Sequence, residues 1–116
     1  VMQGVAFAFA DCRDALAATG TMIHRALAIG GGARSDYWLQ ALATTLGFPL
    51  DVPAQGEFGA ALGAARLAVM AVTGAGAEIA TTPPLSHSVE PDQALAEAYA
   101  AAHARYRAAY TALRAL

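Results

Sequence analysis

Three consecutive glycines, Gly30, Gly31 and Gly32, stand between a short apolar run and a polar segment that could begin a helix. Glycines let a ligand approach the backbone without a Cβ in the way, and the free N–H groups at a helix start favour negative charge. The segment is therefore suited to a phosphate group. It is neither the GxGxxG dinucleotide motif nor a P-loop, because that spacing and the lysine are missing. Taken alone, the glycines favour a turn that only needs positive φ over a ligand site.

Other reactive side chains give weaker signals. Cys12 is the only cysteine, so no disulfide can form within the chain, and its place in an apolar helical stripe favours buried packing over a role as a nucleophile. Asp11, Asp14 and Asp51 lie on the edges of predicted elements, outside any glycine-threonine phosphate loop. The histidines show no spacing typical of metal ligands, so we assign no metal site. They are His24, His87 and His103.

The composition excludes several classes of partner. The 116 residues suit one domain or part of one. A formal net charge of −2 and scattered arginines give no basis for binding nucleic acid. No uncharged apolar run reaches the roughly 20 residues that cross a membrane. The charges of Asp11, Arg13 and Asp14 make the first twenty residues unlike a signal peptide. We therefore expect a cytoplasmic protein without membrane contact.

The elements that would position the glycines follow from apolar spacing. Residues 26–29 form a short apolar run, typical of a buried strand that ends at a backbone-rich turn. After the glycines, Ser35 suits a helix N-cap and Asp36 suits the positive end of the helix. An apolar stripe beginning at Trp38 continues this helix to Gly47, which suits its stop.

The rest of the chain extends the same alternation of helices and strands. A helix is indicated over residues 1–19, a strand over 50–52, and a helix over 59–73 with a face small enough for close approach of another backbone. Residues 74–91 are expected to form a connecting loop and 92–116 the C-terminal helix. The apolar stripe of the first helix consists of Val1, Val5, Phe9, Cys12 and Leu16.

This order predicts a layered α/β architecture in which a right-handed crossover joins parallel strands. Two strands cannot form a stable sheet alone, so we expect the remaining strands to come from further sequence or from another chain. The pattern of the first helix already includes Val1, with no N-cap before it. We therefore expect residues 1–116 to be a single partial domain of a longer protein.

Two longer segments give the glycine turn a context. They are Gly30-Gly31-Gly32-Ala33-Arg34-Ser35-x-x-Trp38-x-Gln40 and Ala61-Leu62-Gly63-Ala64-Ala65-Arg66-Leu67-Ala68. In this order they resemble the C-terminal half of the FGGY family of sugar kinases, and within it the xylulokinases. The resemblance covers residues 1–75 strongly and the tail weakly. It implies part of an actin-like, ribonuclease H-like domain, the hexokinase-type ATPase fold.

The resemblance also implies a nucleotide site. In the family such a turn holds the adenosine and α-phosphate of ATP, which here implies Gly31, Gly32 and Ala33. Asp36 falls where relatives often place a polar residue near adenine or ribose, so it is a candidate nucleoside contact. A partner for the helix dipole is its equal alternative. Trp38 could stack on adenine, but its place on the apolar stripe favours packing in the core or against another subunit.

The residues that perform phosphoryl transfer are expected outside this chain. The reaction needs Mg²⁺ near the β- and γ-phosphates and usually a base aligned with the attacking hydroxyl. In the family these come from an Asp-x-Gly-Thr-type phosphate loop and a catalytic Asp that precede the present segment. We therefore expect the chain alone to be inactive, and the full-length protein to be a homodimeric kinase of D-xylulose. A kinase of ribulose, glycerol or another polyol, or a non-catalytic nucleotide-binding or dimerisation module, are the alternatives.

Overall fold

The computed structural model describes residues 1–54 and 59–114. Its helices are α1 (Met2–Ala18), α2 (Asp36–Leu46), α3 (Gly59–Thr73) and α4 (Gln93–Arg114). Its strands are β1 (Ala26–Leu27), β2 (Leu50–Pro53) and β3 (Leu85–Val89), with short 3-10 helices η1 (Gly31–Arg34) and η3 (Ala77–Ile79). The α/β class is confirmed, and each predicted helix is present within one residue of its expected start. The last two residues of the predicted C-terminal helix lie outside the described range.

The strands form one mixed sheet in the order β1-β2-β3. β1 and β2 are parallel, with Ala26 opposite Leu50, as the crossover through α2 predicts. β3 pairs antiparallel with β2, so Val89 also lies opposite Leu50. The sheet therefore has one more strand than the sequence indicated.

The strand β3 corrects the expectation that residues 74–91 only connect other elements. Only Leu85 and Val89 are apolar in this strand, and Pro84 and Pro91 flank it, so its composition is typical of a loop. Backbone pairing with β2 and packing of Val89 against the core hold the segment extended instead. Tertiary contacts, rather than local propensity, decide its structure.

The core lies between α2 and the sheet. Alternate residues of β2 point toward α2, whose start and end match the predicted signals. The N-cap Ser35 accepts a hydrogen bond from the backbone N–H of Trp38 at 3.3 Å, and Gly47 ends the helix in the left-handed region at φ 75°. The buried core cluster consists of Leu39, Ala43, Phe48, Leu50 and Val52.

Helix α1 buries a different face from the one predicted. Ala6, Phe7 and Ala10 are buried, whereas Phe9 is 51% exposed and Cys12 is also exposed. The small alanines allow close packing against neighbouring helices, and the ring of Phe7 packs among aromatic side chains of α4. The expected packing of the Val1–Val5–Phe9–Cys12–Leu16 stripe is therefore wrong within this chain, because every member of that stripe is exposed.

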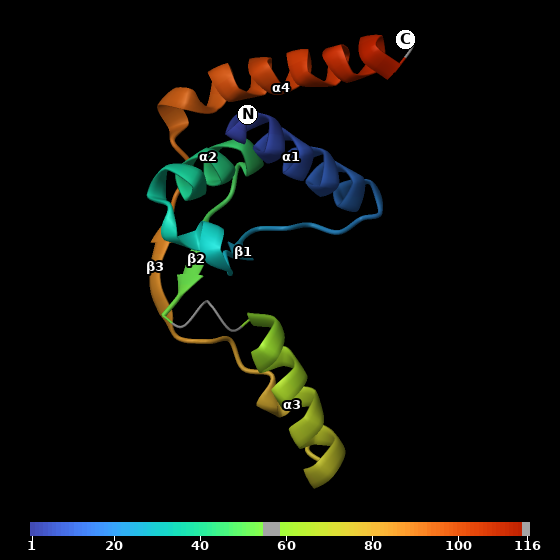
Figure 1. Ribbon diagram of the computed structural model, residues 1–116, viewed down its shortest axis with the longest axis vertical. Helices are drawn as coiled ribbons and strands as arrows, with labels where there is room; N and C mark the ends of the chain where they lie inside the picture. Colours follow the sequence, from blue (N-terminus) through green and yellow to red (C-terminus); the bar gives the residue numbers. More distant parts are fainter. Residues whose placement is uncertain (55–58, 115–116) are drawn as a thin grey trace.

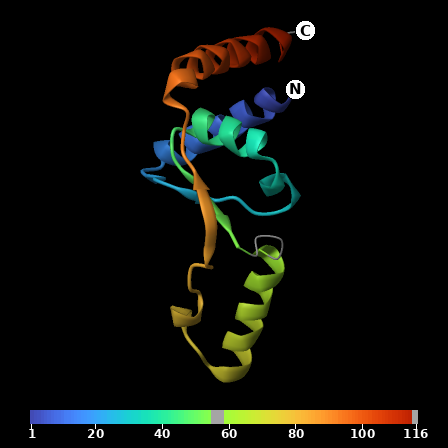
Figure 2. The ribbon, with the colours of Figure 1, turned by 90° about the vertical axis from the view of Figure 1, so that its left-hand side faces the viewer.

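The chain is elongated, with extents of 54 × 31 × 25 Å. Helices α1, α2 and α4 gather at one end, the sheet lies in the middle, and α3 extends away at the other end (Figure 1). Turned by 90°, the segment after α3 runs back beside that helix and continues into β3 (Figure 2). Among the described residues, no helix is long and apolar enough to cross a membrane.

Candidate functional site

The glycine turn follows β1 and leads into α2 through η1. The turn begins at Gly30, the N-cap of η1, which has φ 84° and ψ −176°. The Ala33 N–H then donates to the Gly30 carbonyl at 3.1 Å, and the Ser35 N–H donates to the Gly32 carbonyl at 3.2 Å. These two bonds close the turn directly onto the N-cap of α2. The predicted strand-turn-helix geometry is confirmed.

The three glycines differ in their backbone conformation and in the space around them. Gly30 needs its conformation, since its positive φ is one that side-chain-bearing residues rarely adopt. Gly31 faces open space, because a Cβ built there would have no neighbour within 4 Å. Gly32 is restricted by packing, because a Cβ there would lie 3.3 Å from both Cδ1 and Nε1 of Trp38. Gly31 is the one of the three with neither a positive φ nor a crowded Cβ position, so the approach to its backbone is unobstructed.

The backbone N–H groups of the turn differ in what they can still bind. The N–H of Ala33 is already used in the bond to Gly30. Within the part of the chain that the structure describes, no backbone acceptor pairs with the N–H groups of Gly31 and Gly32. Two adjacent donors beside the positive end of α2 suit an oxyanion. The turn thus fits a phosphate group at Gly31 and Gly32, while Ala33 contributes mainly to the shape of the turn.

The polar and aromatic candidates lie next to this turn. Asp36 is the first residue of α2 and is exposed. Its carboxylate would accept hydrogen bonds from hydroxyl or amino groups, but it would repel a phosphate placed directly against it. Trp38 is half-buried, with the edge of its indole against Gly32. Packing is therefore an observed role of Trp38.

One apolar hollow borders the turn, and a second lies beside the residue that precedes it. One, of about 260 Å³, is lined by Gly32, Ala33 and Trp38 together with apolar side chains of α1, β1 and α2. The second, of about 190 Å³, lies between the end of β1 and the start of α3. There a Cβ at Gly59 would overlap Cδ1 of Ile29, the residue that precedes the glycines. The predicted small face of α3 thus lets the side chain of Ile29 approach the helix at Gly59. A Cβ at Gly63 would have nothing within 4 Å.

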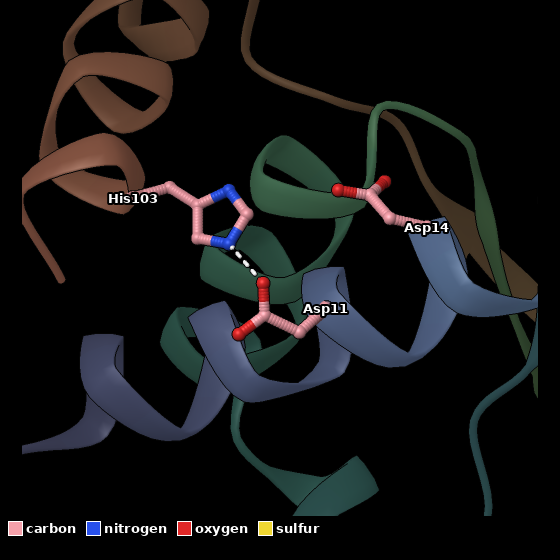
Figure 3. Close-up of side chains that lie close together, drawn as sticks. All are labelled: Asp11, Asp14 and His103. Atoms are coloured by element: carbon pink, nitrogen blue, oxygen red, sulfur yellow. Dashed lines mark hydrogen bonds and ion pairs between the residues drawn. The ribbon is translucent and has the colours of Figure 1, made fainter. Parts of the chain in front are cut away.

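A separate cluster joins α1 to α4. The ligand atoms of Asp11, Asp14 and His103 all lie within 4.8 Å of one another. Figure 3 shows His103 reaching from α4 to Asp11, with Asp14 further along α1. The Nε2–H of His103 donates to Oδ1 of Asp11 at 2.9 Å. No sequence spacing could indicate this group, because His103 is 92 positions away from Asp11.

The carboxylates of this cluster already have cationic partners. Arg13 binds Asp14 with Nη2 at 2.6 Å from Oδ1, and also donates from Nη1 to the Leu46 carbonyl at 2.8 Å. Nε of Arg107 lies 3.5 Å from Oδ1 of Asp11. A divalent cation would have to displace these partners. The cluster is best described as an ion-pair network that joins helices, and the Arg13 bond also satisfies a free carbonyl at the end of α2.

Comparisons with known proteins agree with one another. The C-terminal domain of the FGGY family of carbohydrate kinases matches residues 1–72. A xylulose kinase of Escherichia coli (strain K12) is 41% identical over 115 residues, which cover 97% of this chain and 24% of that protein. The chain thus spans about a quarter of the length of this relative.

Two solved structures also match. The crystal structure of a xyloylose kinase from Brucella ovis has a TM-score of 0.90 and 50% identity, covering 98% of this chain and 24% of that one. That of a xylulose kinase from Rhodospirillum rubrum has a TM-score of 0.77 and 28% identity, covering 97% of this chain and 23% of that one. The fold described above is therefore the one found in solved carbohydrate kinases.

Proposed function

Because the chain belongs to the FGGY family of carbohydrate kinases, we propose that it forms part of the ATP site of a D-xylulose kinase, in which the glycine turn binds the nucleotide. The likeness to xylulose kinases over nearly the whole chain supports the sugar. The observation that carries the nucleotide role is the pair of adjacent N–H donors at Gly31 and Gly32, with open space at Gly31.

The residues of the turn would bind and orient the nucleotide. The N–H groups of Gly31 and Gly32 donate to an oxygen of the α-phosphate, and the dipole of α2 adds to this attraction. Asp36 accepts hydrogen bonds from the ribose or the adenine amino group, at a distance from the phosphates that avoids repulsion. Ala33 shapes the turn through its bond to Gly30. The geometry holds one end of ATP so that its γ-phosphate can meet a hydroxyl bound elsewhere.

The remaining parts of the reaction lie in the rest of the protein. Mg²⁺, when bound, neutralises charge on the β- and γ-phosphates during phosphoryl transfer. We place its protein ligands, the catalytic Asp and the sugar-binding residues outside residues 1–116, and so expect the isolated chain to be inactive. We further propose that the complete protein is a cytoplasmic homodimer.

A coupled assay of ADP release by the full-length protein tests the function. D-Xylulose should be phosphorylated at its 5-hydroxyl with a higher kcat/KM than D-ribulose or glycerol, and chelation of Mg²⁺ should abolish turnover. Residues 1–116 prepared alone should give no turnover above a blank. A full-length protein that binds ATP but prefers ribulose or glycerol would retain the nucleotide proposal and overturn the sugar. A protein that binds no ATP would overturn both.

A further inference from the structure

The side chain of Trp38 lies directly against the glycine turn. A Cβ at Gly32 would meet Cδ1 and Nε1 of the indole at 3.3 Å, which is closer than ordinary van der Waals contact. The two preceding glycines meet nothing within 4 Å. The absence of a side chain at Gly32 is therefore explained by the indole, without any need for a ligand at that Cβ position.

Gly32, Ser35 and Trp38 form a closed set of contacts. The Gly32 carbonyl accepts from the Ser35 N–H at 3.2 Å, and Ser35 Oγ accepts from the Trp38 N–H at 3.3 Å. The indole of Trp38 in turn packs against Gly32. Trp38 belongs to the first turn of α2, and its neighbour Leu39 is 1% exposed in the core. The position of the indole is thus fixed by a helix that packs on the sheet.

We infer that Trp38 is a positioning residue for the nucleotide: its indole holds the turn at Gly32 so that the N–H groups of Gly31 and Gly32 remain directed toward the phosphate. This inference rests on the proposed function. The physical reason is that two donors gain full strength toward an anion only when they are held in place before it binds. Without the indole, the exposed turn could rotate away from this geometry.

Paired substitutions in the full-length protein test the inference. Gly32→Ala should push on the indole and weaken ATP binding, measured as a dissociation constant by titration calorimetry, by about tenfold, which corresponds to ~1.4 kcal/mol. Trp38→Ala should weaken ATP binding by a similar factor, while D-xylulose binding changes less than about twofold. Because the new methyl group enters the space that the indole leaves, the double variant should bind ATP more tightly than the product of the single effects predicts.

Two further variants serve as controls. Trp38→Phe keeps an aromatic edge near Gly32 and should bind ATP within about threefold of the wild type, whereas a merely bulky apolar residue such as Leu should not rescue binding. Gly31→Ala meets no side chain, so its effect on ATP should be the same with Trp or Ala at position 38. Should Trp38→Ala fail to fold, the same comparison is made with Trp38→Leu.

The outcomes separate this inference from the proposed function. If the wild type binds no ATP, the proposed function fails and the inference fails with it. If the wild type binds ATP but Gly32→Ala and Trp38→Ala lower only the unfolding temperature, the indole packs without positioning the nucleotide. If the double variant binds ATP as the product of the two single effects predicts, the contact between Gly32 and the indole is not the cause of either loss. If Trp38→Ala weakens ATP binding and adding Gly32→Ala restores none of it, stacking of the indole on adenine would be favoured instead.

Discussion

Asp11 and His103 join the first and last helices of the chain through a hydrogen bond of 2.9 Å. The ring of His103 also stacks on Phe7, with centroids 5.6 Å apart and planes inclined by 27°. His103 therefore connects α4 to α1 in two ways, one polar and one aromatic. The side chain of His103 is 15% exposed and that of Asp11 is 41% exposed, so the aromatic contact is better shielded from water than the carboxylate.

We expect His103→Ala to destabilise the protein more than Asp11→Asn. Asn retains an acceptor for His103 and loses only the attraction of a partly exposed charge, which is worth about 1 kcal/mol or less. Ala removes the hydrogen bond and the ring stack together, and aromatic pairs add roughly 0.5–1.5 kcal/mol beyond buried area. Urea unfolding of the two variants measures the difference. Equal losses would contradict the expected contribution of the ring stack, and a larger loss in Asp11→Asn would show that the charge matters more than ring packing.

Asp51 provides a second polar connection, across all three strands. Its side chain is 8% exposed, and its carboxylate accepts from Arg25 at 2.8 Å and from the hydroxyl of Ser88. Arg25 precedes β1 and Ser88 belongs to β3, opposite Asp51 in the sheet register. A buried carboxylate in the central strand is tolerated because both partners satisfy it.

Replacing Asp51 by Ala should cost roughly 1.5–3 kcal/mol, the range for hydrogen bonds to charged groups. Arg25 is 57% exposed and can return to water, which limits the loss. Ser88→Ala, which removes one donor and leaves the ion pair intact, should cost less. Glu97→Gln changes an exposed carboxylate of α4 and serves as the matched control, within about 0.5 kcal/mol of the wild type. An Asp51→Ala variant as stable as this control would contradict the network.

Local signals in the sequence identified the elements around the turn. The capping role of Ser35 and the left-handed stop at Gly47 depend only on neighbouring residues, and both were predicted. Apolar spacing located α3 and the parallel pairing of the first two strands. The nucleotide role of Gly31, Gly32, Ala33 and Asp36 stays a prediction.

Features set by distant residues could not be predicted from spacing. The contact of His103 with Asp11 depends on how α4 crosses α1, and β3 depends on β2 for its structure. The buried face of α1 was predicted wrongly because apolar spacing identifies an apolar stripe but not what covers it. In this chain Phe9 lies on the exposed side. The contact of Gly32 with Trp38 likewise requires the turn to fold back on α2.

The exposed stripe of α1 leads to a prediction for the isolated chain. Val5, Phe9 and Leu16 are each about half exposed, and contiguous apolar surface of this kind promotes association. Residues 1–116 alone should therefore self-associate at micromolar concentration and bind a hydrophobic dye. Replacing Val5 and Phe9 together by Ser should reduce both signals in light scattering and dye fluorescence. Met22→Ser, which changes an apolar residue that is 73% exposed but lies outside the stripe, should leave them unchanged. A monomer that binds no dye would contradict the prediction.

Alanine at Gly30 and alanine at Gly31 should affect stability and ATP binding in different ways in the full-length protein. Gly30→Ala forces a side chain into positive φ and should cost roughly 1–3 kcal/mol of stability. Gly31→Ala has neither positive φ nor a neighbour within 4 Å, so it should unfold like the wild type. Its methyl group would nevertheless obstruct the approach of phosphate to the N–H groups, and losing one charge-assisted bond of about 1.5–3 kcal/mol raises the ATP constant at least tenfold. Thermal unfolding and ATP titration measured on both variants decide the matter. If Gly31→Ala binds ATP as the wild type does, the phosphate does not approach the turn at Gly31, and the assignment of its N–H to the nucleotide must be withdrawn.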